Sequence, residues 1–225
     1  MCSTLALVTL AFAATGVAPA SFQDKTLVVW AAPANLTQRG GSVLTLEDQR
    51  DHFDAIVFGE LRPACWMAGS DSFLRTQKDQ ANYVAETVGT DALVQMAIVY
   101  RGKQVAVYRS GSLYAQHTIA APQTFGADSM AVFGLRHLTA GDGACFAGSI
   151  DDARIYDRAL TVEQLRALKP NQLSDPKPWA WWTFENDQAI EIMQALPLVE
   201  LAGNTRVDKG RLVLDGQESY AVFRS

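Results

Sequence analysis

Long apolar runs, clusters of basic residues and the short motifs of several enzyme classes are all missing from this sequence. The chain has 19 Lys and Arg against 24 Asp and Glu, and no basic run that could follow a phosphate backbone. No segment after the uncharged leader approaches the ~20 apolar residues that a membrane-spanning helix requires. Phosphate loops, Gly-x-Ser-x-Gly elbows and metal-spaced Cys or His clusters are absent as well. These absences argue against a nucleic-acid partner and against a membrane span.

Residues 1–20 are almost free of charge, with an apolar stretch over residues 5–14 and a small-residue exit at Ala18-Pro19-Ala20. This pattern predicts a secretory signal peptide, and therefore a mature chain of residues 21–225 that is secreted to an extracellular or periplasmic compartment. A membrane anchor and a wrongly chosen start codon are the alternatives, because the leader lacks Lys and Arg.

Cysteine is scarce, with three residues in the chain. Cys2 would leave with the signal peptide, so Cys65 and Cys145 would remain in an oxidising compartment. Residues 64–71 and 144–151 have similar sequences and could form strands that lie side by side. We expect either a disulfide between Cys65 and Cys145 or two unpaired buried thiols.

Short β-type runs bounded by Gly, Pro, Asn or Asp follow one another from Lys25 onward. Between them, residues 71–89 are polar and aperiodic, which predicts a long surface excursion of the kind that carries binding residues. Thr161 and Gln164 predict the capping box of a short helix. The pattern indicates an all-β antiparallel sandwich of two sheets with one short helix. The predicted strands are residues 26–30, 42–46, 53–58, 65–68, 93–100, 104–109, 113–115, 130–135 and 148–156.

Three segments carry a family resemblance: residues 94–102, residues 107–111 and, most strongly, residues 148–160, which read GSIDDARIYDRAL. The chain resembles the bacterial secreted members of the laminin-G-like, concanavalin A-like lectin/glucanase superfamily. The resemblance covers about residues 25–170 and implies a jelly-roll β-sandwich of two antiparallel sheets.

The order of the segments departs from that family. Its members usually open with strands that this chain carries near its C-terminus, at residues 179–186 and 210–222. We therefore expect a circularly permuted jelly roll, in which residues 21–225 are one domain and residues 179–225 supply the opening strands. The alternative is a jelly roll over residues 21–170, a linker over residues 171–178 and the start of a second domain at residues 179–225.

The strand Gly148–Tyr156 contains the best candidate ion site. Alternation predicts that Asp151 faces the core, whereas Asp152 and Arg154 form an ion pair on the outer surface worth under ~1 kcal/mol. A carboxylate facing a core is costly unless it is compensated.

For that carboxylate, the family resemblance implies a structural Ca²⁺ held by Asp151 together with the chain around Glu185 and Asn186. Oxygen ligands of this kind suit calcium. The alternative is that Asp151 accepts backbone N–H groups at the sheet edge.

Glycan binding needs aromatic platforms and planar hydrogen-bonding groups, because a sugar has an apolar face and a rim of hydroxyls. The candidates flank the 71–89 excursion or follow a strand end, and each has the alternative of an ordinary core or solvated residue. A strand with a Glu-x-Asp-x-Glu pattern, as a glucanase of this fold would need, is absent. The candidate carbohydrate-binding residues are Trp66, Arg75, Tyr83, Arg136 and His137.

These observations favour a secreted, non-catalytic module that binds a polysaccharide or another glycan, or that mediates adhesion. The resemblance implies an accessory role in a larger polysaccharide-processing protein, such as a glycoside hydrolase with further domains. The alternatives are a glycan-cleaving enzyme of the same fold and a structural spacer without a ligand.

Overall fold

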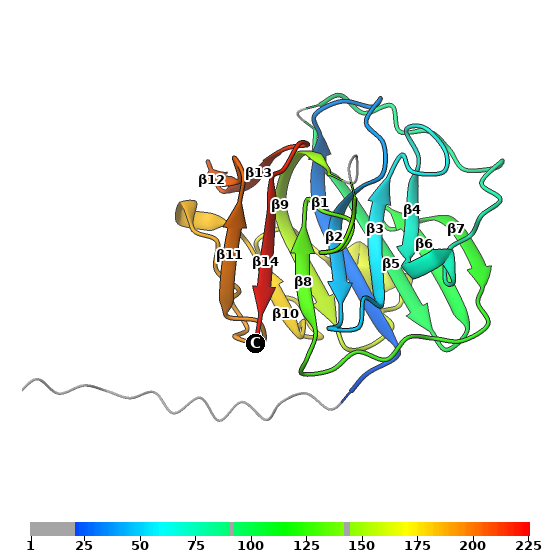
Figure 1. Cartoon of the computed structure of the whole chain (residues 1–225). Coiled ribbons are helices and arrows are strands. Elements are labelled where there is room, and N and C mark those ends of the chain that lie inside the picture. Colours follow the sequence, from blue (N-terminus) through cyan, green and yellow to red (C-terminus); the bar gives the residue numbers. More distant parts are fainter. Residues whose placement is uncertain (1–20, 91, 142–144) are drawn as a thin grey trace, which may run out of the picture.

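The computed structural model describes residues 21–90, 92–141 and 145–225, and it consists of two antiparallel sheets packed face to face (Figure 1). The predicted signal peptide, residues 1–20, lies outside the described residues. The all-β prediction is confirmed: the described chain is a jelly-roll sandwich with one short α-helix, α1 (Val162–Ala167), and two 3-10 turns, η1 (Asp71–Phe73) and η2 (Glu185–Asp187).

The larger sheet has eight strands in the order β12-β13-β9-β1-β5-β6-β7, with β10 also paired to β9. The smaller sheet has six strands in the order β11-β14-β8-β2-β3-β4. The eight-stranded sheet comprises β1 (Lys25–Pro33), β5 (Val94–Arg101), β6 (Gln104–Arg109), β7 (Ser112–Thr118), β9 (Ala147–Tyr156), β10 (Ala180–Trp182), β12 (Arg206–Asp208) and β13 (Arg211–Asp215). The six-stranded sheet comprises β2 (Gly41–Glu47), β3 (Phe53–Phe58), β4 (Trp66–Ser70), β8 (Met130–Phe133), β11 (Leu198–Ala202) and β14 (Tyr220–Arg224).

The middle of the chain and its C-terminal part meet in the core between the sheets. The ring of Phe133 packs edge-on against the rings of Trp182, Phe184 and Phe223, with centroids 5.1, 5.9 and 5.6 Å away. In the sheets themselves, β10 and β13 pair with β9, and β14 pairs with β8. The last third of the chain therefore contributes strands and core aromatics to both sheets (Figure 1).

Helix α1 begins as its sequence predicts. The Thr161 hydroxyl accepts a hydrogen bond from the Gln164 backbone N–H (3.2 Å), and the Gln164 side chain accepts one from the Thr161 N–H (2.8 Å). Leu160 and Leu165 are buried together against Val28 on the outer face of the eight-stranded sheet. The capping box is thus confirmed, and it fixes the helix over β1 and β5.

The predicted surface ion pair of Asp152 and Arg154 is wrong, because neither side chain is exposed. Arg154 donates from Nε and Nη2 to the two carboxylate oxygens of Asp152 at 2.8 and 2.9 Å. The guanidinium lies between the rings of Trp30 and Trp181, at 5.1 and 5.2 Å from their centroids. The ring of Trp181, which projects from β10 beside β9, and the backbone of Lys169 and Asn171 cover the face that alternation assigns to solvent.

The predicted disulfide is also wrong, since Cys65 and Cys145 are both free. Cys65 is buried beside Met67 and Tyr83, whereas Cys145 packs in a different cluster with Leu135. The strands that follow them belong to different sheets, β4 to the six-stranded and β9 to the eight-stranded one, so they do not pair.

Within residues 21–90, 92–141 and 145–225, none of the helices has the length and apolar character needed to cross a membrane.

Candidate functional site

Trp66, a predicted sugar platform, lies in the core between the sheets with no exposed surface. Its ring packs against Phe58 at 4.7 Å, and its Nε1 donates to Glu86 at 3.0 Å. The prediction for Trp66 is wrong, because the ring faces inward from β4 and cannot reach a ligand.

Arg75 is also buried, with 4% of its surface exposed. Its guanidinium donates to Asp54 Oδ1 at 2.7 Å and to the Phe53 carbonyl at 2.9 Å, and it also pairs with Asp71. Asp54 in turn lies 2.9 Å from the ammonium of Lys25. Burial and this ion network keep Arg75 away from the surface, so the prediction that it contacts sugar is wrong.

Arg136 and His137 lie on the outer side of the six-stranded sheet. The His137 ring stacks on Phe53 with centroids 4.8 Å apart, and burial lowers its pKa. Arg136 pairs with Glu60, and its carbonyl accepts a hydrogen bond from Thr45 (2.9 Å). Neither residue lines the pocket that contains Tyr83, so the predicted five residues do not form one groove.

Tyr83 does line a pocket, together with side chains that the sequence did not single out. We call it the loop-side pocket. Its volume is about 260 Å³, and it lies where residues 77–83 pass the edge strand β7. The Tyr83 ring meets the Tyr114 ring edge-on, with centroids 5.3 Å apart. The lining residues are Gln77, Asp79, Asn82, Tyr83, Tyr114, Ala115 and Gln116.

The two tyrosines in this pocket are held in neutral, oriented states. The Tyr114 hydroxyl donates to the Val84 carbonyl at 2.7 Å. Burial raises the pKa of Tyr83 to about 12, and burial likewise raises the pKa of Tyr114. Both phenols therefore stay uncharged at physiological pH. Tyr83 is buried, with 8% of its surface exposed, whereas Tyr114 is half-buried and presents ring surface beside the amides of Gln77, Asn82 and Gln116.

The loop that carries Asn82 and Tyr83 is anchored at both ends. Arg62 donates to the Gln80 carbonyl at 2.7 Å. Glu86 accepts from Trp66 Nε1 and, at 2.9 and 2.8 Å, from Nε and Nη2 of Arg109. Burial alone would raise the pKa of Glu86, but the hydrogen bonds from Arg109 and Trp66 outweigh it and lower the pKa to about 2. The anchoring carboxylate is therefore ionised throughout the physiological range.

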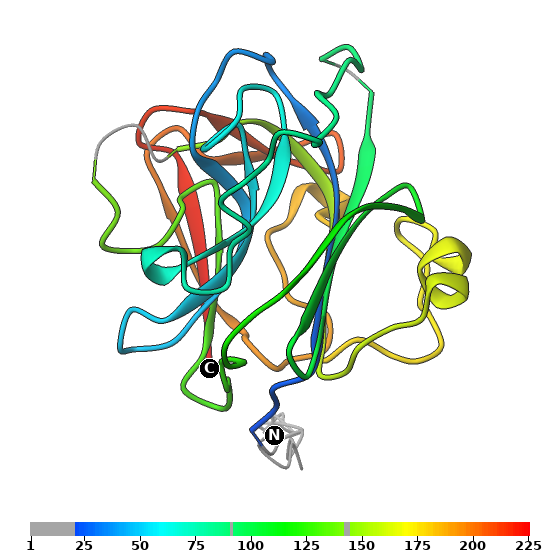
Figure 2. The same ribbon diagram turned by 90° about the vertical axis from the view of Figure 1, so that its right-hand side faces the viewer.

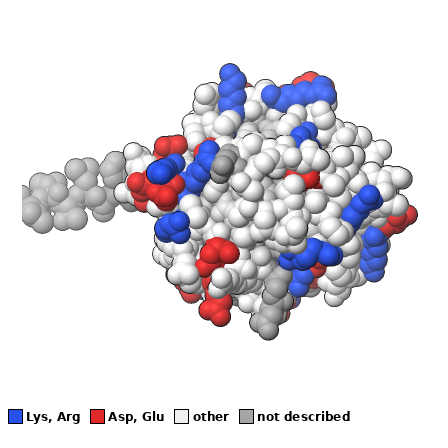
Figure 3. Space-filling model, turned by 90° about the horizontal axis from the view of Figure 1, so that it is seen from above, with Lys and Arg blue, Asp and Glu red and all other residues white. Residues whose placement is uncertain are grey.

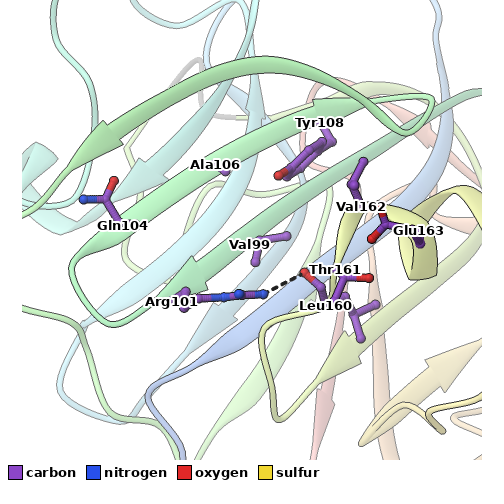
Figure 4. Close-up of a pocket in the computed structure, with 9 residues that line it drawn as sticks. All are labelled: Val99, Arg101, Gln104, Ala106, Tyr108, Leu160, Thr161, Val162 and Glu163. Atoms are coloured by element: carbon purple, nitrogen blue, oxygen red, sulfur yellow. Dashed lines mark hydrogen bonds between the residues drawn. The ribbon is translucent and has the colours of Figure 1, made fainter.

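A second pocket lies on the outer face of the eight-stranded sheet, at the start of α1 (Figure 4). We call it the helix-side pocket. Its volume is about 290 Å³. Arg101 extends across it toward the Leu160 carbonyl, with Nη2 at 3.4 Å, and the side chains of Tyr108 and Glu163 lie along its helix side (Figure 4). The lining residues are Val99, Arg101, Gln104, Ala106, Tyr108 and residues 160–163.

Charged side chains of both signs are scattered over the face seen from above, without a continuous patch of one sign (Figure 3). The loop-side pocket contains one carboxylate, Asp79, and none of its lining residues is Lys or Arg. The helix-side pocket contains one charge of each sign, Arg101 and Glu163.

Two of the predicted calcium ligands, Asp151 and Glu185, come together around the side-chain amide of Asn171. Its Nδ2 lies 3.2 Å from Asp151 Oδ2 and 3.0 Å from Glu185 Oε1. Arg211 Nε lies 3.4 Å from the other oxygen of Asp151. The third predicted ligand, Asn186, has a left-handed backbone (φ 58°).

The donor set around Asp151 fits a hard cation only if Asn171 takes part. No group of three or more His, Cys, Asp or Glu side chains within the described ranges could hold a metal ion. The Oδ1 atom of Asn171, however, is buried without a hydrogen-bond partner. Rotation of the amide by a half turn would place that oxygen between Asp151 and Glu185, which gives three oxygen donors of the type that calcium accepts.

Three solved structures illustrate what the fold is similar to. A candidate carbohydrate-binding protein from Bacteroides ovatus ATCC 8483 matches with a TM-score of 0.55 at 11% identity, over 90% of this chain and 52% of that one. A native heptameric SAP-like pentraxin from Limulus polyphemus matches with a TM-score of 0.50 at 14% identity, over 92% and 86%. Domain 4 of AbnA, a GH43 extracellular arabinanase from Geobacillus stearothermophilus, solved with arabinotriose, matches with a TM-score of 0.49 at 20% identity, over 65% and 66%.

The chain thus spans about half the length of the Bacteroides protein, and at these identities the shared property is the fold. No curated protein matches the chain by sequence. A family model, described as concanavalin A-like lectin/glucanases superfamily, matches residues 10–166, which is well over half of the chain. The two-sheet architecture and this match lead to the same conclusion: the chain belongs to the concanavalin A-like lectin/glucanase superfamily.

Proposed function

We propose that this chain is a carbohydrate-binding module and that it binds sugar in the loop-side pocket. The observation that carries the proposal is the pairing of the Tyr83 and Tyr114 rings beside three amide side chains, at Gln77, Asn82 and Gln116. The half-buried Tyr114 ring, which packs against the buried Tyr83, provides apolar surface for the C–H face of a sugar, and amides donate to and accept from its hydroxyls. Membership of a superfamily that contains lectins supports this assignment.

The residues that line the loop-side pocket favour a binding role without catalysis. Glycoside hydrolysis ordinarily uses a pair of carboxyl groups on either side of the scissile bond. The loop-side pocket has Asp79 as its one lining carboxylate, and that side chain is exposed and accepts a hydrogen bond from the Ala81 N–H (3.1 Å). We propose further that the module is secreted and serves a larger polysaccharide-processing protein.

A glycan array with purified residues 21–225 tests the binding proposal. We expect signal on one class of glycans, and we expect Asn82→Ala and Gln116→Ala to weaken it about tenfold, because each removes a hydrogen-bonding amide from the pocket. Gln49→Ala is the matched control, since Gln49 is an exposed amide in the turn between β2 and β3. Absence of binding to every glycan, or equal losses for all three variants, would contradict the proposal.

Incubation of the bound glycan with the protein tests the absence of catalysis. We expect no release of reducing sugar. Release that survives repurification and disappears in a pocket variant would favour a glycan-cleaving enzyme instead.

We also propose a structural calcium ion held by Asp151, Asn171 and Glu185. The buried, unpartnered Oδ1 of Asn171 supports it, because a cation would give that oxygen a partner. Calcium there would neutralise the two carboxylates and join the segment after α1 to the turn η2.

A further inference from the structure

The two pockets lie on opposite sides of the β6–β7 hairpin. Figure 2 shows this hairpin between the loop after β4 and helix α1. Strand register connects the pockets directly: Val99 on β5 is paired with Ala106 on β6, and Ala106 is paired with Gln116 on β7. Val99 and Ala106 line the helix-side pocket, and Gln116 lines the loop-side pocket. Because neighbouring strands are about 4.8 Å apart, this row from pocket to pocket spans about 10 Å.

A short side chain, that of Ala106, lies on the surface between the two pockets. Ala106, at the centre of the row, ends at its Cβ. In the adjacent row, the exposed side chains of Gln104 and Thr118 bond to each other (Nε2 to Oγ1, 3.0 Å). Helix α1 covers β1 and β5 but leaves the outer face of β6 and β7 exposed at Gln104 and Gln116. A ligand chain can therefore cross β6 over Ala106, between Tyr108 on one side and the bonded pair of Gln104 and Thr118 on the other, and reach the amide of Gln116.

The helix-side pocket repeats the chemistry of the loop-side pocket. It has a half-buried tyrosine, Tyr108, an amide, Gln104, and the charged groups of Arg101 and Glu163. Aromatic surface beside planar donors and acceptors suits a second sugar ring of the same polymer.

The charged residues that line the two pockets favour an uncharged polymer over an anionic one. Across both pockets the lining residues carry two carboxylates, Asp79 and Glu163, and one guanidinium, Arg101, which is 3.4 Å from the Leu160 carbonyl. A uronic or sialic acid would meet more negative than positive charge, and its desolvated carboxylate would lack a partner in the loop-side pocket.

We propose that the loop-side and helix-side pockets are two subsites of one surface that binds a neutral, linear polysaccharide along its length. This inference rests on the proposed carbohydrate-binding function and adds the ligand class and a second subsite. A chain that fills both subsites gains the second contact without a second loss of translational freedom, so affinity rises with chain length until both are occupied.

Native gel electrophoresis in gels that contain arabinan, galactomannan, mixed-linkage β-glucan or levan, with polygalacturonate as the anionic comparison, tests the ligand class. We expect at least one neutral polymer to retard the protein and polygalacturonate to leave its mobility unchanged. Stronger retardation by polygalacturonate than by every neutral polymer would overturn the charge argument. Failure of all five polymers to retard the protein would overturn both this inference and the proposed function.

Calorimetric titration with di- to hexasaccharides of the polymer that binds tests the second subsite. We expect the hexasaccharide to bind at least about tenfold more tightly than the disaccharide, and Tyr108→Ala to remove most of that gain. Gln49→Ala, an exposed amide outside both pockets, is the control and should retain the gain. The thermal melting curve of Tyr108→Ala is measured beside it, and an unchanged curve shows that the loss comes from the subsite and not from unfolding. If the di- to hexasaccharides all bind with equal affinity while Gln116→Ala still weakens binding, the second subsite is overturned and the proposed function stays intact.

Discussion

Arg154 forms two hydrogen bonds with Asp152, two residues earlier on the same strand, and both side chains are completely buried. Asp152 Oδ2 also accepts from Trp181 Nε1 (2.9 Å) and from the Asn171 N–H (2.7 Å). Arg154 donates to the Lys169 carbonyl at 2.7 Å. The pair thereby fastens the segment after α1 to the outer face of β9 and binds the side chain of Trp181 on the neighbouring strand β10.

Replacement of the buried carboxylate should be strongly destabilising. Asp152→Asn leaves the Arg154 charge buried without a counter-ion, so we expect the free energy of unfolding to fall by about 3 to 5 kcal/mol. Asp157→Asn is the matched control, because its pair with Arg158 is 35% and 57% exposed and should contribute under about 1 kcal/mol. Urea denaturation measures both variants, and equal losses would contradict the buried-pair argument.

Removal of residues 176–225 should prevent cooperative folding if the chain is one permuted domain. The fragment 21–175 would lose β10, β13 and β14, which pair with β9 and β8. It would also lose Trp182 and Phe223 from around Phe133. We expect an insoluble fragment, or one without a thermal transition. A soluble fragment that melts cooperatively would instead favour two separate domains.

Calcium should stabilise the folded protein if Asp151, Asn171 and Glu185 hold the ion. A ligand that binds only the folded state raises its stability, so excess calcium should raise the melting temperature of protein stripped with chelator. Asp151→Asn should abolish the rise, and Asp157→Asn should keep it. Identical melting curves with and without calcium would rule this site out.

Glu47 should make stability depend on pH near neutrality. Burial raises its pKa to about 7, with smaller contributions from Asp51 and Asp48, while a hydrogen bond from the Leu138 N–H opposes the shift. The folded state therefore holds a proton that the unfolded state releases near the ordinary glutamate pKa of 4.5. The contribution of Glu47 to the free energy of unfolding is therefore most favourable below pH 4.5, and it falls as the pH rises from 4.5 to about 7.

Glu47→Gln should remove this dependence. We expect the variant to be more stable than the wild type at pH 8, by about 1 to 3 kcal/mol, and nearly equal to it at pH 5. Urea denaturation at the two pH values measures the difference. A constant difference between variant and wild type across this range would refute the role of Glu47.

Sequence patterns locate the strands and the helix well, because β alternation and the capping box of Thr161 and Gln164 are local signals. Alternation also separates Asp152 and Arg154 from the core-facing side of β9. It cannot show that the Trp181 ring and the segment after α1 cover this face, which is why the sequence predicts an exposed pair. The prediction for Trp66 fails for a related reason, since its position next to a loop does not reveal which face of β4 it occupies.

The loop-side pocket illustrates a different limit. Tyr83 can be singled out because it lies in a polar excursion, but Tyr114 and Gln116 lie about thirty residues later in a strand with ordinary alternation. Their relevance depends on the passage of residues 77–83 along the edge of β7. Contact between segments so far apart has no local signal in a single sequence.

The bonds made by Glu86 bear on the entropy cost of the glycan binding proposed for the loop-side pocket. This carboxylate joins Trp66 of the six-stranded sheet to Arg109 of the eight-stranded sheet, three residues after Tyr83. The loop is therefore fixed to both halves of the sandwich before any sugar arrives, and little ordering entropy is left to be lost on association. Recognition should be lock-and-key, with the free and the occupied pocket superimposing closely.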